Sequence, residues 1–214
     1  MPQITHMEFK RRRPERFIIY WDNGDEHIFS PESVVKYGLA PGKEISEEEY
    51  LLILREDGIR RAKDQILKYL GIRPHSRKEL LLKTLGKGFS REVIEPALKD
   101  LQEVDLIDDR RFTRQFIQNE MLLRPCGKNL LKEKLLNRGV PPDISQPILD
   151  ELYEEDSQED IVRKIAEKFL ERNRHPDQQK RSEKLIRHLQ GKGFDWETIR
   201  WVLYESGLLD SDDT

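Results

Sequence analysis

The chain has 214 residues, of which 36% are hydrophobic and 37% are charged, a composition typical of a globular protein with thin cores. Its net charge of −3 argues against a uniformly basic nucleic-acid-binding protein, so such a role would depend on local clusters of charge. No apolar run reaches the length of a membrane span and no signal peptide opens the sequence, which predicts a cytoplasmic protein without a membrane partner. The single cysteine, Cys126, excludes an internal disulfide, and we expect it to be a packed thiol.

The first 45 residues predict a β extension with a short helix. Alternation at residues 5, 7 and 9 indicates a first strand, and residues 17–21 and 27–29 flank Asn23-Gly24, the strongest two-residue hairpin signal. These runs predict a small three-stranded sheet. Ser30 and Pro31 are typical of the start of a helix that Gly38 can end.

Residues 46–72 predict a helix that connects the extension to the rest of the chain. Ser46 and Glu49 have the spacing of a capping box, and the pattern continues past Gly58 into the first repeat.

A short pattern then recurs along the chain. Lys87-Gly88-Phe89 and Lys192-Gly193-Phe194 are separated by 105 residues, and a variant, Arg138-Gly139-Val140, lies between them. Each glycine is suited to the left-handed position that ends a helix, and we expect Ser90, Asp143 and Asp195 to cap the helices that follow. Three such signals predict three helical repeats.

The predicted fold is mainly α, with three tandem three-helix, helix-turn-helix-like repeats in an elongated array behind the N-terminal β extension. After the connecting helix, residues 73–107 complete the first repeat, residues 108–156 form the second and residues 157–209 the third. Residues 210–214 are expected to be a disordered acidic tail. Counted from each glycine, positions +9 and +10 are apolar in every repeat, so the same face of each last helix should be buried. In the final helix we expect Trp201 to face the core and Trp196 to be exposed.

The middle helix of each predicted repeat is basic, whereas the last helix is acidic. Residues 77–87 contain four basic side chains and one acidic side chain, and residues 143–156 contain no basic and six acidic ones. Two interpretations remain open: the basic helices pair with the acidic helices, or they form a basic ladder that contacts phosphates or acidic patches of a partner. The candidate contact residues are Lys83, Lys87, Lys132, Lys134, Arg138, Lys184, Arg187 and Lys192. A second basic cluster, Arg11, Arg12 and Arg13, lies in the predicted loop between the first two strands, where it either reaches a phosphate backbone or is simply solvated.

The sequence has no glycine-rich phosphate loop, no nucleophile elbow and no histidine or cysteine group at metal-ligand spacing. We therefore expect no enzymatic activity, no cofactor and no metal.

Several of these motifs, in this order, are similar to those of the RecX family, bacterial regulators of the RecA recombinase. The resemblance covers residues from about 60 to 207. The residues that carry it are Arg73-Pro74-His75-Ser76, Glu79-Leu80, Leu85, Lys87-Gly88-Phe89, Leu106-Ile107-Asp108-Asp109, Phe112, Gly127, Leu135 and Gly139-Val140. The N-terminal sheet resembles an extension that some members of the family carry.

The resemblance implies a monomeric, non-enzymatic modulator, mainly an inhibitor, that lies in the groove of a RecA filament on single-stranded DNA. It implies that the protein hinders filament extension, ATP hydrolysis, strand exchange and repressor autocleavage. Two alternatives remain. One is a direct, helix-turn-helix-like DNA-binding regulator of transcription, whose affinity for DNA should fall steeply with salt in the absence of RecA. The other is a helical scaffold for another protein that binds neither DNA nor RecA.

Overall fold

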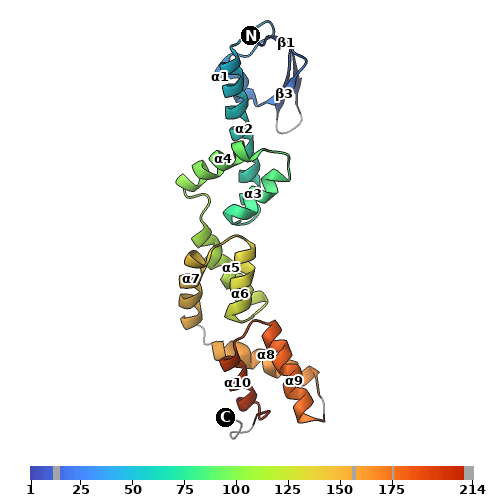
Figure 1. Ribbon diagram of the computed structural model, residues 1–214, viewed down its shortest axis with the longest axis vertical. Helices are drawn as coiled ribbons and strands as arrows, with labels where there is room; N and C mark the ends of the chain where they lie inside the picture. Colours follow the sequence, from blue (N-terminus) through green and yellow to red (C-terminus); the bar gives the residue numbers. More distant parts are fainter. Residues whose placement is uncertain (12–14, 156–157, 175, 210–214) are drawn as a thin grey trace. The chain divides into compact units, whose positions relative to one another are not determined.

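Figure 1 shows the computed structural model, which describes residues 1–11, 15–155, 158–174 and 176–209. The predicted disordered tail, residues 210–214, lies outside this range. Among the described residues, every helix falls short of the combination of length and hydrophobicity that a membrane span requires. The described elements are, in chain order, β1 (Ile4–Lys10), β2 (Arg16–Trp21), β3 (Glu26–Phe29), α1 (Pro31–Tyr37), α2 (Glu47–Leu70), α3 (Arg77–Leu85), α4 (Arg91–Glu103), α5 (Asp109–Leu123), α6 (Lys128–Asn137), α7 (Pro142–Glu155), α8 (Gln158–Arg172), α9 (Gln178–Gly191) and α10 (Trp196–Glu205).

The three strands form the predicted antiparallel sheet in the order β1-β2-β3. Phe17 of β2 lies opposite Phe9 of β1 and Phe29 of β3, which sets the register. Gly24 has a φ of 87°, so the hairpin turns where the Asn-Gly pair predicts. One face of the sheet packs on α1 and the first half of α2 through buried side chains: Ile4, Ile19, Trp21, Phe29, Leu39, Tyr50 and Ile53.

The predicted helix caps of the N-terminal region are present. Ser30 Oγ accepts a hydrogen bond from Ser33 N at the start of α1, and Gly38 ends this helix with a φ of 56°. Ser46 Oγ accepts from Glu49 N at the start of α2. The helix then runs unbroken through Gly58, where a Cβ would lie 2.9 Å from Val93 Cγ1 of α4. The absence of a side chain at this position lets α4 pack closely on α2.

The chain divides into two compact units, which are described separately. The first comprises Met1–Pro74 and Leu80–Ile107, and the second comprises His75–Glu79 and Asp108–Thr214. The core around α2, α3 and α4 lies in the first unit, and those of the α5–α7 and α8–α10 groups lie in the second.

Glycines end the middle helix of each group in the predicted way. Gly88, Gly139 and Gly193 have φ values of 86°, 79° and 80°, the left-handed conformation that favours glycine. The predicted register is also confirmed, because the side chains at positions +9 and +10 are buried in all three groups: Ala97, Leu98, Ile148, Leu149, Val202 and Leu203. Trp196 is 56% exposed and Trp201 is packed against the third core, as expected.

The caps predicted after the glycine turns are only partly right. Asp195 caps α10 by accepting from Thr198 N at 2.8 Å, but Ser90 precedes α4 without a side-chain hydrogen bond to it. The prediction for Asp143 is wrong, because α7 already begins at Pro142 and Asp143 lies within its first turn. Proline suits the first helical position, since its φ is preset and its missing N–H would have no partner there.

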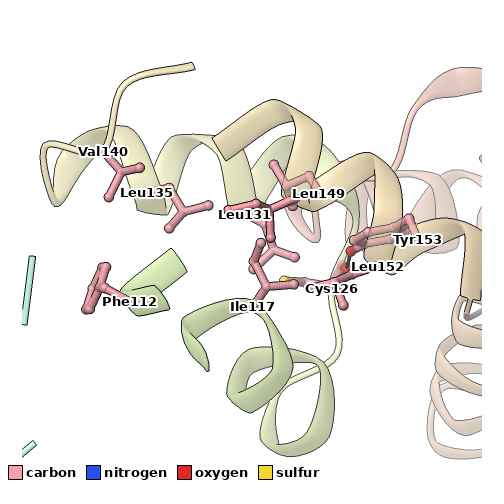
Figure 2. Close-up of a cluster of buried hydrophobic side chains, with 10 residues drawn as sticks. Phe112, Ile117, Cys126, Leu131, Leu135, Val140, Leu149, Leu152 and Tyr153 are labelled. Carbon is pink, nitrogen blue, oxygen red and sulfur yellow. Dashed lines mark hydrogen bonds between the residues drawn. The ribbon is translucent and has the colours of Figure 1, made fainter. Parts of the chain in front are cut away.

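Cys126 is a packed thiol, as the sequence predicts. Its sulfur lies among Ile117, Leu131 and Leu152 in the core of α5, α6 and α7 (Figure 2). Burial raises the pKa of the Cys126 thiol, which disfavours the nucleophilic thiolate. The Tyr153 hydroxyl donates to the Cys126 carbonyl at 2.6 Å, so this segment is also held through its backbone.

Candidate functional site

The third glycine turn packs against the start of the basic helix α6. Gly127 N donates to the Lys192 carbonyl at 2.8 Å, and Asn129 N donates to the Gly193 carbonyl at 3.1 Å. A Cβ at Gly193 would lie 2.3 Å from Leu130 N, and one at Gly127 would lie 2.3 Å from the Gly193 oxygen. The two backbones therefore approach so closely that both positions require glycine.

The second turn makes the same kind of contact with residues 75–79, which include the start of α3 and belong to the second unit. Ser76 Oγ donates to the Arg138 carbonyl at 2.6 Å, and Arg138 Nε lies 3.5 Å from the Glu79 carboxylate. A Cβ at Gly139 would lie 2.2 Å from the side chain of Lys78. The two contacts share one feature. The carbonyl of the residue before the glycine, Lys192 or Arg138, accepts a hydrogen bond from the residue that precedes a basic helix, Gly127 or Ser76.

The first glycine turn, at Gly88, does not pack against the start of another helix in the described part of the chain. Gly88 has nearly the same φ as the other two glycines, yet no described heavy atom lies within 4 Å of the place its Cβ would occupy. Instead, Lys87, Gly88 and Phe89 line a cavity of about 620 Å³ within the first unit. Its other walls come from β2, β3, the start of α1 and one face of α2.

A buried carboxylate holds one wall of this cavity in place. Asp57 of α2 is 2% exposed and accepts hydrogen bonds from Ser30 N at 2.9 Å and Ser30 Oγ at 2.8 Å, which ties the start of α1 to α2. Arg61 Nε lies 3.0 Å from the other oxygen of Asp57 in an ion pair that lacks good hydrogen-bond geometry. Burial lowers the pKa of Arg61; the charge of Asp57 opposes this shift and that of Arg16 adds to it.

The basic helices differ in whether their cations pair within the protein or are exposed to a partner. In the second group, Lys134 is partly buried and pairs with Glu120 of α5, and Lys128 pairs with Asp150 of α7. Arg138, besides approaching Glu79, has its guanidinium 4.4 Å from the centre of the Phe116 ring. Much of the positive charge of α6 is therefore committed to contacts within the protein.

The cations of α3, of the turn after it and of α9 are more accessible. Lys83, Lys87, Lys184 and Arg187 are all exposed, and neither Lys87 nor Lys184 forms an ion pair with any described residue. Lys83 lies 5.2 Å from the Tyr69 ring centre, and Arg187 lies 3.9 Å from Glu183 on its own helix. Lys132 and Lys192 are half-buried. In the basic loop Arg11 is exposed, whereas Arg12 and Arg13 lie outside the described residues.

Lys134→Glu is expected to lower the free energy of unfolding by roughly 1–2 kcal/mol, because it places two carboxylates together in a partly buried site. Lys184→Glu, the same change on exposed α9, should alter it by less than about 0.5 kcal/mol. Urea unfolding of both variants provides the measurement. Adding Glu120→Lys to Lys134→Glu should recover much of the loss, and equal stability of the two single variants would contradict a structural role for the pair.

The sequence analysis missed the α2 residues that line the cavity. Arg61, Asp64, Gln65 and Lys68 occupy positions i, i+3, i+4 and i+7, so they share one face of the helix. That polar spacing is visible in the sequence, but it is also typical of an ordinary solvated face. The sequence does not show that β2 and the first glycine turn lie opposite this face of α2 and complete the cavity.

Comparison with known proteins gives one consistent result. Family models of the first and third three-helix domains of RecX match residues 62–101 and 156–203. Regulatory protein RecX of Clostridioides difficile strain 630 is 31% identical over 200 residues, which are 94% of this chain and 93% of that protein. Its counterpart from Prosthecochloris aestuarii strain DSM 271 is 38% identical over 154 residues, covering 71% of this chain and 97% of that one.

Solved structures show the same fold. A crystal structure of regulatory protein RecX aligns with a TM-score of 0.70 and 23% identity over 94% of this chain and 98% of that chain. RecX from Lactobacillus salivarius aligns with a TM-score of 0.64 and 25% identity over 72% of this chain and 99% of that chain.

Proposed function

The chain belongs to the RecX family, and we propose that it is a non-enzymatic modulator, mainly an inhibitor, of the RecA filament on single-stranded DNA. In this role it limits filament extension, ATP hydrolysis and strand exchange in the cytoplasm. Similarity over 94% of the chain to a protein named regulatory protein RecX carries the proposal.

The tandem groups suit a periodic partner. A filament repeats the same surface along its length, and each further contact by a linked module is made at a raised effective concentration. The cations of α3, of the turn after it and of α9 support contacts of this kind, since their side chains are exposed at the surface, where phosphates or acidic protein groups bind. Lys83, Lys87, Lys184 and Arg187 are therefore the first residues to test, ahead of the internally paired Lys134 and Arg138.

Charge reversal on α3 with the turn that follows it, or on α9, is expected to weaken inhibition of RecA. Lys83→Glu/Lys87→Glu and Lys184→Glu/Arg187→Glu should each raise the concentration for half-inhibition of the DNA-dependent RecA ATPase about tenfold, equivalent to about 1.4 kcal/mol of binding. The measurement is ATP hydrolysis by RecA on single-stranded DNA with increasing amounts of each variant. Raising the salt concentration should mimic the substitutions.

The matched control is Lys99→Glu on the acidic helix α4, which should inhibit like the unaltered protein. Thermal melts must show that the variants remain folded, as expected for exposed charges. Full inhibition by both double variants would rule out these cations as contacts. An unaltered protein that binds DNA with steep salt dependence but leaves RecA unaffected would instead favour the helix-turn-helix-like DNA-binding regulator.

A further inference from the structure

We propose that the cavity between the N-terminal sheet and the first glycine turn binds a backbone phosphate of single-stranded nucleic acid. This inference deepens the proposed function, on which it rests for the role of the DNA. It assigns the first unit a DNA contact of its own, which can be measured without RecA.

Four cations converge on the cavity from three parts of the first unit. Arg16 comes from β2, Arg61 and Lys68 from α2, and Lys87 from the turn after α3. Within the described chain, Arg16, Lys68 and Lys87 form no ion pair. Burial is the main cause that lowers the pKa of Arg61, the charge of Asp57 opposes it, and the nearby charge of Arg16 adds a smaller lowering, which reflects repulsion between the two guanidinium groups. A bound anion would relieve that repulsion.

Acidic side chains in the same lining restrict the kind of anion. Glu15, Glu32 and Asp64 also line the cavity, so four positive charges in the lining face three negative ones. Outside the lining, Asp57 pairs with Arg61 and Arg60 pairs with Glu32, which leaves this balance unchanged. Such a balance suits a phosphodiester, which carries one charge, better than a terminal phosphate or a nucleotide triphosphate, which carries more. It therefore favours a polynucleotide backbone over a free nucleotide.

The aromatic ring in the lining favours nucleic acid over an acidic peptide. Phe89 is partly buried against the first core, and the guanidinium of Arg61 lies 5.8 Å from the centre of its ring. An aromatic side chain beside a cationic groove is a common arrangement for single-stranded nucleic acid, because any base can stack on the ring.

The turn itself leaves room for a backbone. The space next to Gly139 is filled by Lys78 and that next to Gly193 by Leu130, whereas the space next to Gly88 is open. The turns at Gly139 and Gly193 use this surface to contact the start of a helix. In the Gly88 turn the same surface is accessible and lies at the edge of the cavity. A phosphate can approach the chain there without meeting a side chain at Gly88.

The test is fluorescence anisotropy of a labelled oligo(dT) with the full-length protein in the absence of RecA. Lys68→Glu/Lys87→Glu is expected to raise Kd at least about tenfold. It should also reduce the slope of log K against log salt by about 0.7 for each lost phosphate contact. The matched control is Arg55→Glu/Lys99→Glu, which reverses two exposed charges of the same unit outside the cavity and should change Kd by less than about threefold.

Three outcomes would overturn the inference. Equal losses in the two double variants would mean that only net charge matters, and no binding of oligo(dT) by the unaltered protein would exclude the site. Displacement of oligo(dT) by a mononucleotide or by a poly-glutamate peptide at equal concentration would show that another ligand is preferred. Because RecA is absent, a protein that binds DNA here but fails to inhibit RecA would contradict the proposed function and leave this site standing.

Discussion

Gly193→Ala is expected to lower the free energy of unfolding by roughly 2–5 kcal/mol, compared with a loss of roughly 1–2 kcal/mol for Gly88→Ala. Both glycines hold the left-handed conformation, with φ values of 80° and 86°, so the conformational cost of a Cβ is the same at both positions. At Gly193, however, the new Cβ would also lie 2.3 Å from Leu130 N. Relieving such overpacking typically costs about a further 1–3 kcal/mol.

The two variants form a matched pair, because they make the same change at the same position of two similar turns. Urea unfolding monitored by circular dichroism gives the difference in stability. Hydrogen exchange should show the extra loss at the hydrogen bonds from Gly127 N and Asn129 N to the third turn. If Gly88→Ala is as damaging as Gly193→Ala, the close approach at the third turn contributes nothing to stability.

Asp57→Ala is expected to lower the free energy of unfolding by about 3 kcal/mol. The substitution removes the acceptor for two hydrogen bonds from Ser30 and leaves Arg61 without its ion-pair partner in a largely desolvated position. Removing one partner of a buried pair typically costs about 3–5 kcal/mol, and the partial exposure of Arg61 places this site at the lower end of that range.

Two further variants separate the contributions at Asp57. Asp57→Asn keeps an oxygen that can accept from Ser30, so it should cost roughly half as much. Asp57→Ala/Arg61→Met should be more stable than Asp57→Ala alone, because no unpaired charge remains. Glu48→Ala, at an exposed position of the same helix, is the control and should change stability by less than about 0.5 kcal/mol. If Asp57→Ala lowers the free energy of unfolding as little as Glu48→Ala does, Asp57 does not join α1 to α2.

Local sequence signals predicted most of the secondary structure correctly. The Asn23-Gly24 turn, the Ser30 and Ser46 caps and the three left-handed glycines each depend on interactions within a few residues, and all are present in the structure. The buried face of the last helix in each group was also predictable, since helical periodicity decides which side chains point the same way. Asp143 was wrongly predicted as a cap because Asp is a common N-cap residue, whereas α7 begins one residue earlier, at Pro142.

The sequence by itself determined the glycine turns that end the middle helices, several of the helix caps, which faces are apolar and which family the chain resembles. Tertiary structure decided what the charged residues do: Asp57 looks like a solvated residue of a long polar helix but is buried against Ser30, and Lys134 looks like a ladder residue but pairs with Glu120. It also decided that the Gly193 turn is covered while the Gly88 turn opens onto a cavity. The physical reason is that caps and periodicity act over one or two helical turns, whereas burial and ion pairing depend on segments that are distant in sequence and meet only in the folded chain.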